Sequence, residues 1–200
     1  MKITSFALIA LLAAPLVASA DDNKPSTTTT DKAKATDKTT TSKLADADLQ
    51  VMSQMHHVNQ MEIDMGKLAQ TKGSTQAVKA YGQTLVRDHT SADKDMLAFA
   101  KKNKTTIPVF KPTDEADQKD MKDDKDMAAH IKTLKGADFD KEFLSMMVAG
   151  HEKVLAKLDS SMGTIQNDDL KTMLGNIKPT IQKHADTARD LQKSNPQAMK

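Results

Sequence analysis

Apolar residues recur at spacings of three and four through four long segments of this chain, and no other feature limits its possible folds so strongly. β-Branched and aromatic residues never alternate with polar ones over a useful length, so strands are not expected. Spacings of three and four place apolar side chains on one helix face, where they can pack on a core. The sequence therefore predicts an all-α domain.

The predicted helices cover residues 46–71, 74–100, 138–162 and 167–191. Ser74 and Asp138 are the expected N-caps of the second and third helices, because their side-chain oxygens can accept bonds from free backbone N–H groups. The acidic pair Asp168 and Asp169 suits the positive end of the fourth helix dipole. Pro179 lies inside the fourth helix and removes a backbone hydrogen bond, so a bend is expected there.

Residues 101–137 connect the second helix to the third, and they far exceed the usual helix-to-helix connection of about 2–8 residues. A further charged helix is predicted over residues 114–135, with Met127, Ile131 and Leu134 facing inward. A connection of this length can cross a whole bundle. The predicted fold is a ferritin-like four-helix bundle in which a long helical crossover joins the second and third helices.

The first 20 residues have the layout of a secretory signal peptide: Lys2, an apolar run over 6–17, and Ala-Ser-Ala at 18–20. The apolar run is too short for a membrane span, which needs about 20 residues. We expect cleavage after Ala20 and a periplasmic location, with no transmembrane segment in the mature chain. The expected organisation is a signal peptide (1–20), a disordered Thr/Lys/Asp-rich tether (21–44), a helical bundle domain (45–193) and a flexible C-terminus (194–200).

Composition removes several classes of function. The chain has no cysteine, which excludes disulfides, thiolate metal sites and cysteine nucleophiles. Its formal net charge is +2 and the two signs are interspersed, so no basic footprint for nucleic acid is present. Oligomeric state cannot be deduced from one chain.

Each predicted helix interrupts its apolar face near the midpoint with one polar residue that can bind a metal. These four residues are Glu62, His89, His151 and His184. Mid-helix positions of a bundle lie at one level whichever way the helices run, so the four side chains could converge. Three imidazoles and one carboxylate could hold a single Zn²⁺, Fe²⁺, Mn²⁺ or Cu²⁺.

Two other interpretations of the quartet stay open. The four groups could form a buried hydrogen-bond network without metal, or they could fail to meet, because helical spacing gives orientation and not distance. Asp88 and Glu152 are each adjacent in sequence to a histidine and rotated about 100° from it, so they are expected to orient ligands. A di-iron centre is disfavoured because its Glu-x-x-His motif does not occur.

A second candidate lies on the first helix, where thioether and imidazole groups suit copper. Its members are Met52, Met55, His56, His57, Met61 and Met65. Methionine also fills irregular cores, which is the simpler explanation for this patch.

Five ordered motifs resemble an uncharacterised family of exported bacterial proteins, the domain of unknown function 4142. They lie at residues 61–69, 86–90, 136–140, 147–152 and 179–184. The resemblance implies a ferritin-like bundle in a Gram-negative envelope, and the family carries no established activity. Val51 departs from the family's usual phenylalanine, and the crossover helix is unusually charged.

The function expected from sequence is therefore that of an exported, non-enzymatic helical bundle with an envelope or stress-related role and an envelope protein as possible partner. A metal-binding protein for storage, sensing or redox chemistry is the alternative.

Overall fold

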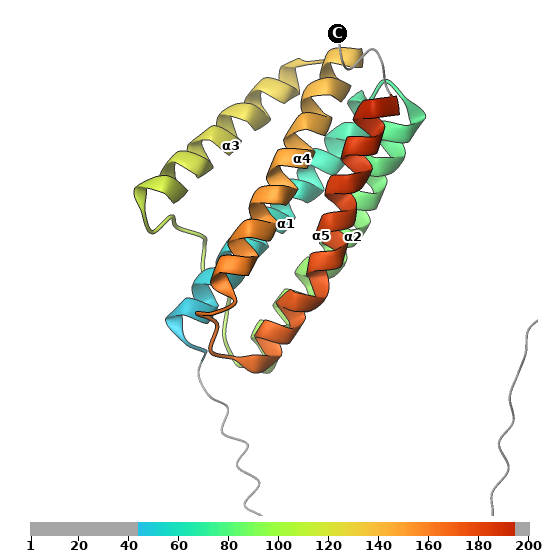
Figure 1. Ribbon diagram of the computed structural model, residues 1–200. Coiled ribbons are helices and arrows are strands. Elements are labelled where there is room, and N and C mark those ends of the chain that lie inside the picture. Colours follow the sequence, from blue (N-terminus) through green and yellow to red (C-terminus); the bar gives the residue numbers. More distant parts are fainter. Residues whose placement is uncertain (1–43, 195–200) are drawn as a thin grey trace, which may run out of the picture. The chain divides into compact units, whose positions relative to one another are not determined.

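The computed structural model describes residues 44–194, which contain five helices and no strand. Helices α1 (Asp46–Lys72) and α2 (Gln76–Lys102) form one hairpin, and α4 (Gly136–Ser161) and α5 (Asp168–Ser194) form another (Figure 1). The long connection between the hairpins contains α3 (Glu115–Thr133). The prediction of an all-α bundle is confirmed.

The four long helices form a ring in which α1 contacts α2 and α4, and α5 contacts the same two helices. Neighbours in this ring run in opposite directions, while α3 lies outside the ring beside α4 (Figure 1). Helices α2 and α4 end at the same end of the bundle. The connection from α2 must therefore run back along the bundle to the opposite end, where α4 begins, and α3 covers most of that distance. This is the crossover expected from its length.

Helix ends follow the chemistry of capping, with two corrections. Thr75 caps α2, because its side chain accepts a hydrogen bond from the Val78 N–H, whereas Ser74 donates to Asp140. Helix α4 begins before Asp138, which lies in its first turn and is not the N-cap. Asn167 accepts a bond from the Leu170 N–H at the start of α5.

The core consists of two apolar clusters separated along the bundle. One includes Met52, Met96, Phe99, Leu158, Leu170 and Leu174. The other includes Met65, Tyr81, Leu85, Phe139, Phe143 and Ala188. On every long helix the predicted polar residue falls between the members of the two clusters, so the quartet occupies a polar layer across the middle of the bundle.

Helix α3 is only weakly apolar. Ile131 is fully buried and Leu134 packs against the second cluster, but Met127 is 40% exposed, so its predicted inward orientation is wrong. Charged residues occupy most of the remaining α3 positions, and the helix is joined to α4 through lysine and aspartate side chains. Helix α5 continues through Pro179.

The predicted signal peptide, nearly all of the tether and residues 195–200 lie outside the described residues. Leu44, assigned by sequence to the end of the tether, is 4% exposed and packs into the first cluster. Among the helices of residues 44–194, none combines the length and the apolar character needed to cross a membrane.

Candidate metal centre

The four polar residues of the middle layer face one cavity. Glu62 comes from α1, His89 from α2, His151 from α4 and His184 from α5, and all four line a space of about 280 Å³. The four side chains are buried, with relative exposures between 2% and 7%. The structure therefore brings the three histidines together, which helical spacing alone could not establish, and places Glu62 on the lining of the same space.

Each histidine uses one ring nitrogen to bond an acceptor that is not another histidine. His89 Nδ1 lies 2.9 Å from the side-chain oxygen of Asn59, and His151 Nδ1 lies 2.7 Å from the Met147 carbonyl oxygen. His184 Nε2 lies 3.0 Å from a carboxylate oxygen of Asp88. Because all three partners are acceptors, these ring nitrogens carry the protons and donate them.

The remaining ring nitrogens are then bare lone pairs. His89 Nε2, His151 Nε2 and His184 Nδ1 are buried and have no hydrogen-bond partner among the described residues. One ring nitrogen from each of the three histidines lies within 4.8 Å of those of the other two. Metal–imidazole bonds of about 2.0–2.1 Å place tetrahedral ligands roughly 3.4 Å apart, so small side-chain movements would bring all three onto one ion.

Burial favours the neutral form of His89 and His184. It lowers the pKa of His89 from 6.5 to about 3, and the neighbouring histidines His151 and His184 act in the same direction. Burial also lowers the pKa of His184, against the opposing hydrogen bond to Asp88. A neutral imidazole is the form that binds metal ions.

Glu62 stands at the edge of the histidine group and is not one of the three converging side chains. Its Oε2 atom is buried without a partner among residues 44–194, and burial raises the pKa of the carboxyl group above its ordinary 4.5. A cation at the histidines would favour the ionised carboxylate, because a nearby opposite charge offsets the loss of water.

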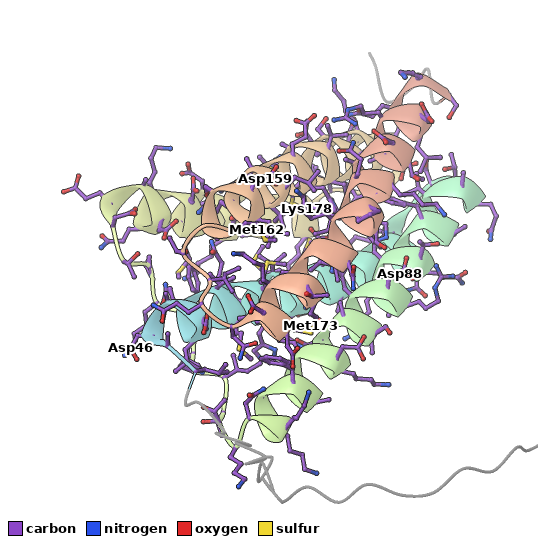
Figure 2. All side chains as sticks on the ribbon, turned by 60° about the horizontal axis from the view of Figure 1, so that its bottom comes forward. Asp46, Asp88, Asp159, Met162, Met173 and Lys178 are labelled. Carbon is purple, nitrogen blue, oxygen red and sulfur yellow. The ribbon has the colours of Figure 1, made fainter. Side chains whose placement is uncertain are left out.

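The two predicted orienting carboxylates behave differently. Asp88 lies on α2 (Figure 2). It accepts hydrogen bonds from His184 of α5 and from Arg87, whose Nε lies 2.7 Å away. Glu152 is exposed and pairs with Arg189, so it does not contact the histidines. The expectation that Glu152 orients a ligand is not met, because its side of α4 faces solvent.

Two orienting groups were missed by sequence analysis. Asn59 lies three residues before Glu62 and therefore on the same face of α1, a signal that could have identified it. Tyr81 donates its hydroxyl to the His184 carbonyl oxygen at 3.0 Å, and its ring meets the imidazole edge-on. Both side chains are buried, which restricts the histidines they touch.

The cavity also has polar, exposed walls between α2 and α5. Ser91 and Asp95 from α2 and Thr180 from α5 line it and are exposed. These residues place the solvent side of the cavity at the α2–α5 surface, and Asp95 adds a negative charge there.

The methionine–histidine patch of α1 is divided: four of its members line a space between α1, α3 and α4, and Met52 and His56 do not. Met52 is buried in the first apolar cluster, while His56 Nδ1 lies 2.5 Å from Asp93. His57 stacks on Phe110 with ring centroids 5.6 Å apart. The histidines of the patch are thus engaged with different neighbours.

The sequence model of the family described as Domain of unknown function (DUF4142) matches residues 33–191. The chain belongs to this family. Comparison with curated proteins gives no match.

Among solved structures, the fold is similar to CopM in its Cu(I)-bound form (TM-score 0.58) and its Cu(II)-bound form (TM-score 0.59). Each comparison has 16% identity and covers 74% of this chain and 96% of CopM. CopM in an Ag-bound form gives a TM-score of 0.57 with the same identity and coverage. The likeness establishes a shared helical-bundle fold.

Proposed function

We propose that this protein captures one divalent transition-metal ion in the middle of its bundle, on the ring nitrogens of His89, His151 and His184, with Glu62 beside the ion. The observation that carries the proposal is the meeting of three histidines on one cavity, each with a buried ring nitrogen that has no hydrogen-bond partner among the described residues. Each ring is held by a hydrogen bond on its other nitrogen, the usual arrangement of histidine ligands.

A network of mutual hydrogen bonds fits the geometry less well. The rings bond Asn59, Met147 and Asp88, and no bond joins one histidine to another in the described residues. An unsatisfied buried polar atom costs about 1–3 kcal/mol, and a single ion would satisfy three nitrogens and the Glu62 carboxylate together. Water in the cavity is the competing explanation, because a space of about 280 Å³ can hold several molecules.

The donor set selects the class of metal. Imidazole suits zinc, copper, nickel and iron, whereas magnesium, calcium and manganese favour oxygen ligands. Three nitrogens and one carboxylate therefore favour Zn²⁺ or Cu²⁺, with Cu²⁺ the tighter by the general order of affinities. The similar bundle of CopM has copper-bound and silver-bound forms, so this architecture is compatible with metal binding.

The proposed role is holding a metal after export. The N-terminal sequence pattern supports transport to the periplasm. Storage and sensing are both consistent with such a site. The proposal does not include catalysis.

The experiment is a titration of the purified, untagged protein with Zn²⁺ and with Cu²⁺ by calorimetry and native mass spectrometry. We expect one ion per chain, and at 100 times the Kd we expect a stabilisation of about 2.7 kcal/mol. His151→Ala and His184→Ala should each weaken binding at least 100-fold.

The matched control is the double substitution His56→Ala and His57→Ala, which removes two partly exposed histidines and should leave binding unchanged. Absence of a bound ion in the wild type would contradict the proposal and favour the water-filled cavity. Loss of binding in the control, with retention in the two core variants, would contradict it as well.

A further inference from the structure

A second cavity lies on the other side of α1, between α1, α3 and α4, and its lining is rich in methionine. Its volume is about 110 Å³. Six of the eleven methionines in the described residues line it: Met55, Met61, Met65, Met121, Met146 and Met147. We call this space the methionine groove. Nothing in the histidine centre requires these side chains, since only Met55 lines both cavities.

The positions of three of these methionines are unusual for core packing. Met61, Met121 and Met146 are only half-buried, although they come from three different helices and line the same groove. Met121 lies on the face of α3 that also carries Ala128 and Ile131, and aspartates occupy the other positions of that face that line the groove. Flexible thioethers that remain accessible are suited to contact a ligand as well as to fill space.

The charges around the groove favour a cation. Asp117, Asp120 and Asp124 line it together with only two lysines, Lys153 and Lys157, which pair with these aspartates. Each of the three aspartates is paired with a lysine, and the aspartates exceed the lysines by one negative charge. Glu62 also lines the groove, and its buried Oε2 has no partner among the described residues.

We propose that the methionine groove binds one soft monovalent cation, Cu⁺, through thioether sulfurs of α1, α3 and α4. Thioethers are soft ligands that select Cu⁺ over Zn²⁺ and the other hard or borderline ions. Binding involves no change of oxidation state and no covalent step. The site is independent of the proposed function, because its donors are sulfur atoms and the histidine centre offers nitrogen.

The two sites adjoin. Met55, Val58, Glu62 and Val154 line both cavities, so this group of side chains forms the partition between them. A protein with both sites would present sulfur donors to Cu⁺ and nitrogen donors to Cu²⁺ within one bundle.

The test uses Ag⁺, a redox-inert substitute for Cu⁺, on the purified protein in the presence of saturating Zn²⁺. The groove variant carries Met61→Leu, Met121→Leu and Met146→Leu, because leucine keeps the volume and removes the sulfur. The control carries Met52→Leu, Met96→Leu and Met173→Leu, three methionines that do not line the groove. Native mass spectrometry and calorimetry measure the stoichiometry and the Kd.

We expect the wild type and the control to bind one Ag⁺, and the groove variant to bind it at least 50-fold more weakly with unchanged Zn²⁺ affinity. X-ray absorption at the silver edge should show sulfur neighbours. Equal Ag⁺ affinity in the groove variant, or a silver ion with only nitrogen and oxygen neighbours, would overturn the proposal. Loss of Ag⁺ binding on His151→Ala alone would assign silver to the histidine centre and overturn it too.

Circular dichroism establishes whether the triple variant folds. If it does not, Met121→Leu alone provides the same test, because that half-buried side chain lies in α3, outside the four-helix ring. The single variant should weaken Ag⁺ binding at least fivefold, and an unchanged Kd would overturn the proposal.

Discussion

The histidine cavity and the methionine groove share a wall at Glu62, but they are built by different means. Around the cavity, each of the three histidine rings is anchored by a hydrogen bond, and α1 and α2 touch backbone to backbone at Gly66 and Gly82. Around the groove, α3 is attached through lysine–aspartate pairs, and three of the methionines stay half-exposed. The difference indicates that one region is preorganised for a defined geometry, whereas the other can adapt to its ligand.

The largest expected effect concerns pH and the anchored cavity. In metal-free protein the lowered pKa values of His89 and His184 mean that the unfolded chain takes up protons first as the pH falls. Stability should therefore be complete above about pH 6.5 and decline toward pH 3, by several kcal/mol if the His89 shift is fully expressed. Urea unfolding with chelator present, at a series of pH values, measures this decline.

Glu62 should act in the opposite sense. Its pKa is raised, so the folded state holds a proton that the unfolded chain loses, and its contribution to stability disappears as the pH rises above 4.5. His89→Gln should flatten the acid side of the profile, and Glu62→Gln should raise stability at neutral pH. In the Glu62→Gln variant, where this opposing effect is removed, a profile that is flat from pH 7 to pH 4 would show that His89 and His184 are not buried as neutral rings.

The lowered histidine pKa values also change the pH at which the protein is expected to release a bound metal. Ordinary histidines would release a metal below about pH 5.5 as they protonate. The lowered pKa values of His89 and His184 predict that Zn²⁺ remains bound at pH 5.

The next effect tests how tightly the two sides of α1 are packed. A Cβ atom on Gly82 would lie 2.6 Å from the Gly66 carbonyl oxygen and 2.8 Å from the Ala69 Cβ. Gly82→Ala should therefore destabilise the protein by about 1–3 kcal/mol. A Cβ on Gly150, in the groove, has its nearest neighbour at 4.0 Å, the Glu62 Oε1 atom.

Gly150→Ala should leave the free energy of unfolding unchanged or raise it by up to about 1 kcal/mol, because alanine favours the helix. Thermal or urea unfolding of both variants makes the comparison. Equal destabilisation by the two substitutions would show that the groove side is as tightly packed as the α1–α2 contact.

A smaller expected effect is a difference in metal affinity between substitutions of Asp88 and Glu152, the two carboxylates that sequence analysis could not distinguish. Asp88→Asn should weaken divalent-metal binding about 10–100-fold, the usual cost of losing a partner that orients a histidine ligand. Glu152→Gln should have no effect, because Glu152 pairs with Arg189 at the surface. Calorimetric titration with Zn²⁺ provides both values, and a stronger effect at Glu152 would mean that the wrong carboxylate has been assigned.

The smallest effect concerns the attachment of α3. Replacing Lys153 and Lys157 by alanine removes pairs with Asp117, Asp120 and Asp124, and partly exposed pairs contribute less than about 1 kcal/mol. Zn²⁺ affinity should not change, because neither lysine lines the histidine cavity. A loss of Zn²⁺ affinity in this variant would show that α3 also supports the histidine cavity, and that the cavity and the methionine groove are not built independently.

Sequence spacing predicted the bundle and the four inward-facing polar residues because both depend on position along a helix. It could not decide between Asp88 and Glu152. One precedes its histidine and the other follows it, so they rotate in opposite directions, and only helix packing determines which meets a neighbour. Sequence spacing likewise could not determine which α3 side chains face inward, since Ile131 is buried and Met127 is exposed.

The methionine groove was predicted only in part: the candidate copper patch contained its three α1 methionines, but not Met121 of α3 or Met146 and Met147 of α4. Met55 and Met65 have the spacing of core residues and are indeed buried, so nothing in the pattern separates them from ordinary packing. Residues of α1, α3 and α4 line the groove together, and the periodicity within one helix does not encode which faces of three helices meet. Sequence analysis could have identified Asn59, because it lies on the same face of α1 as Glu62.

The most direct measurement is a long-range ¹H–¹⁵N correlation spectrum of the protein labelled with ¹⁵N-histidine, recorded at neutral pH during titration with Zn²⁺. The hydrogen bonds predict neutral rings with the proton on Nδ1 of His89 and His151 and on Nε2 of His184. Zn²⁺ should shift the opposite nitrogen of each of these three rings, at one equivalent, and leave His56, His57 and His130 unchanged. Protonated rings, reversed tautomers, or shifts confined to the other three histidines would contradict a metal centre in the middle of the bundle.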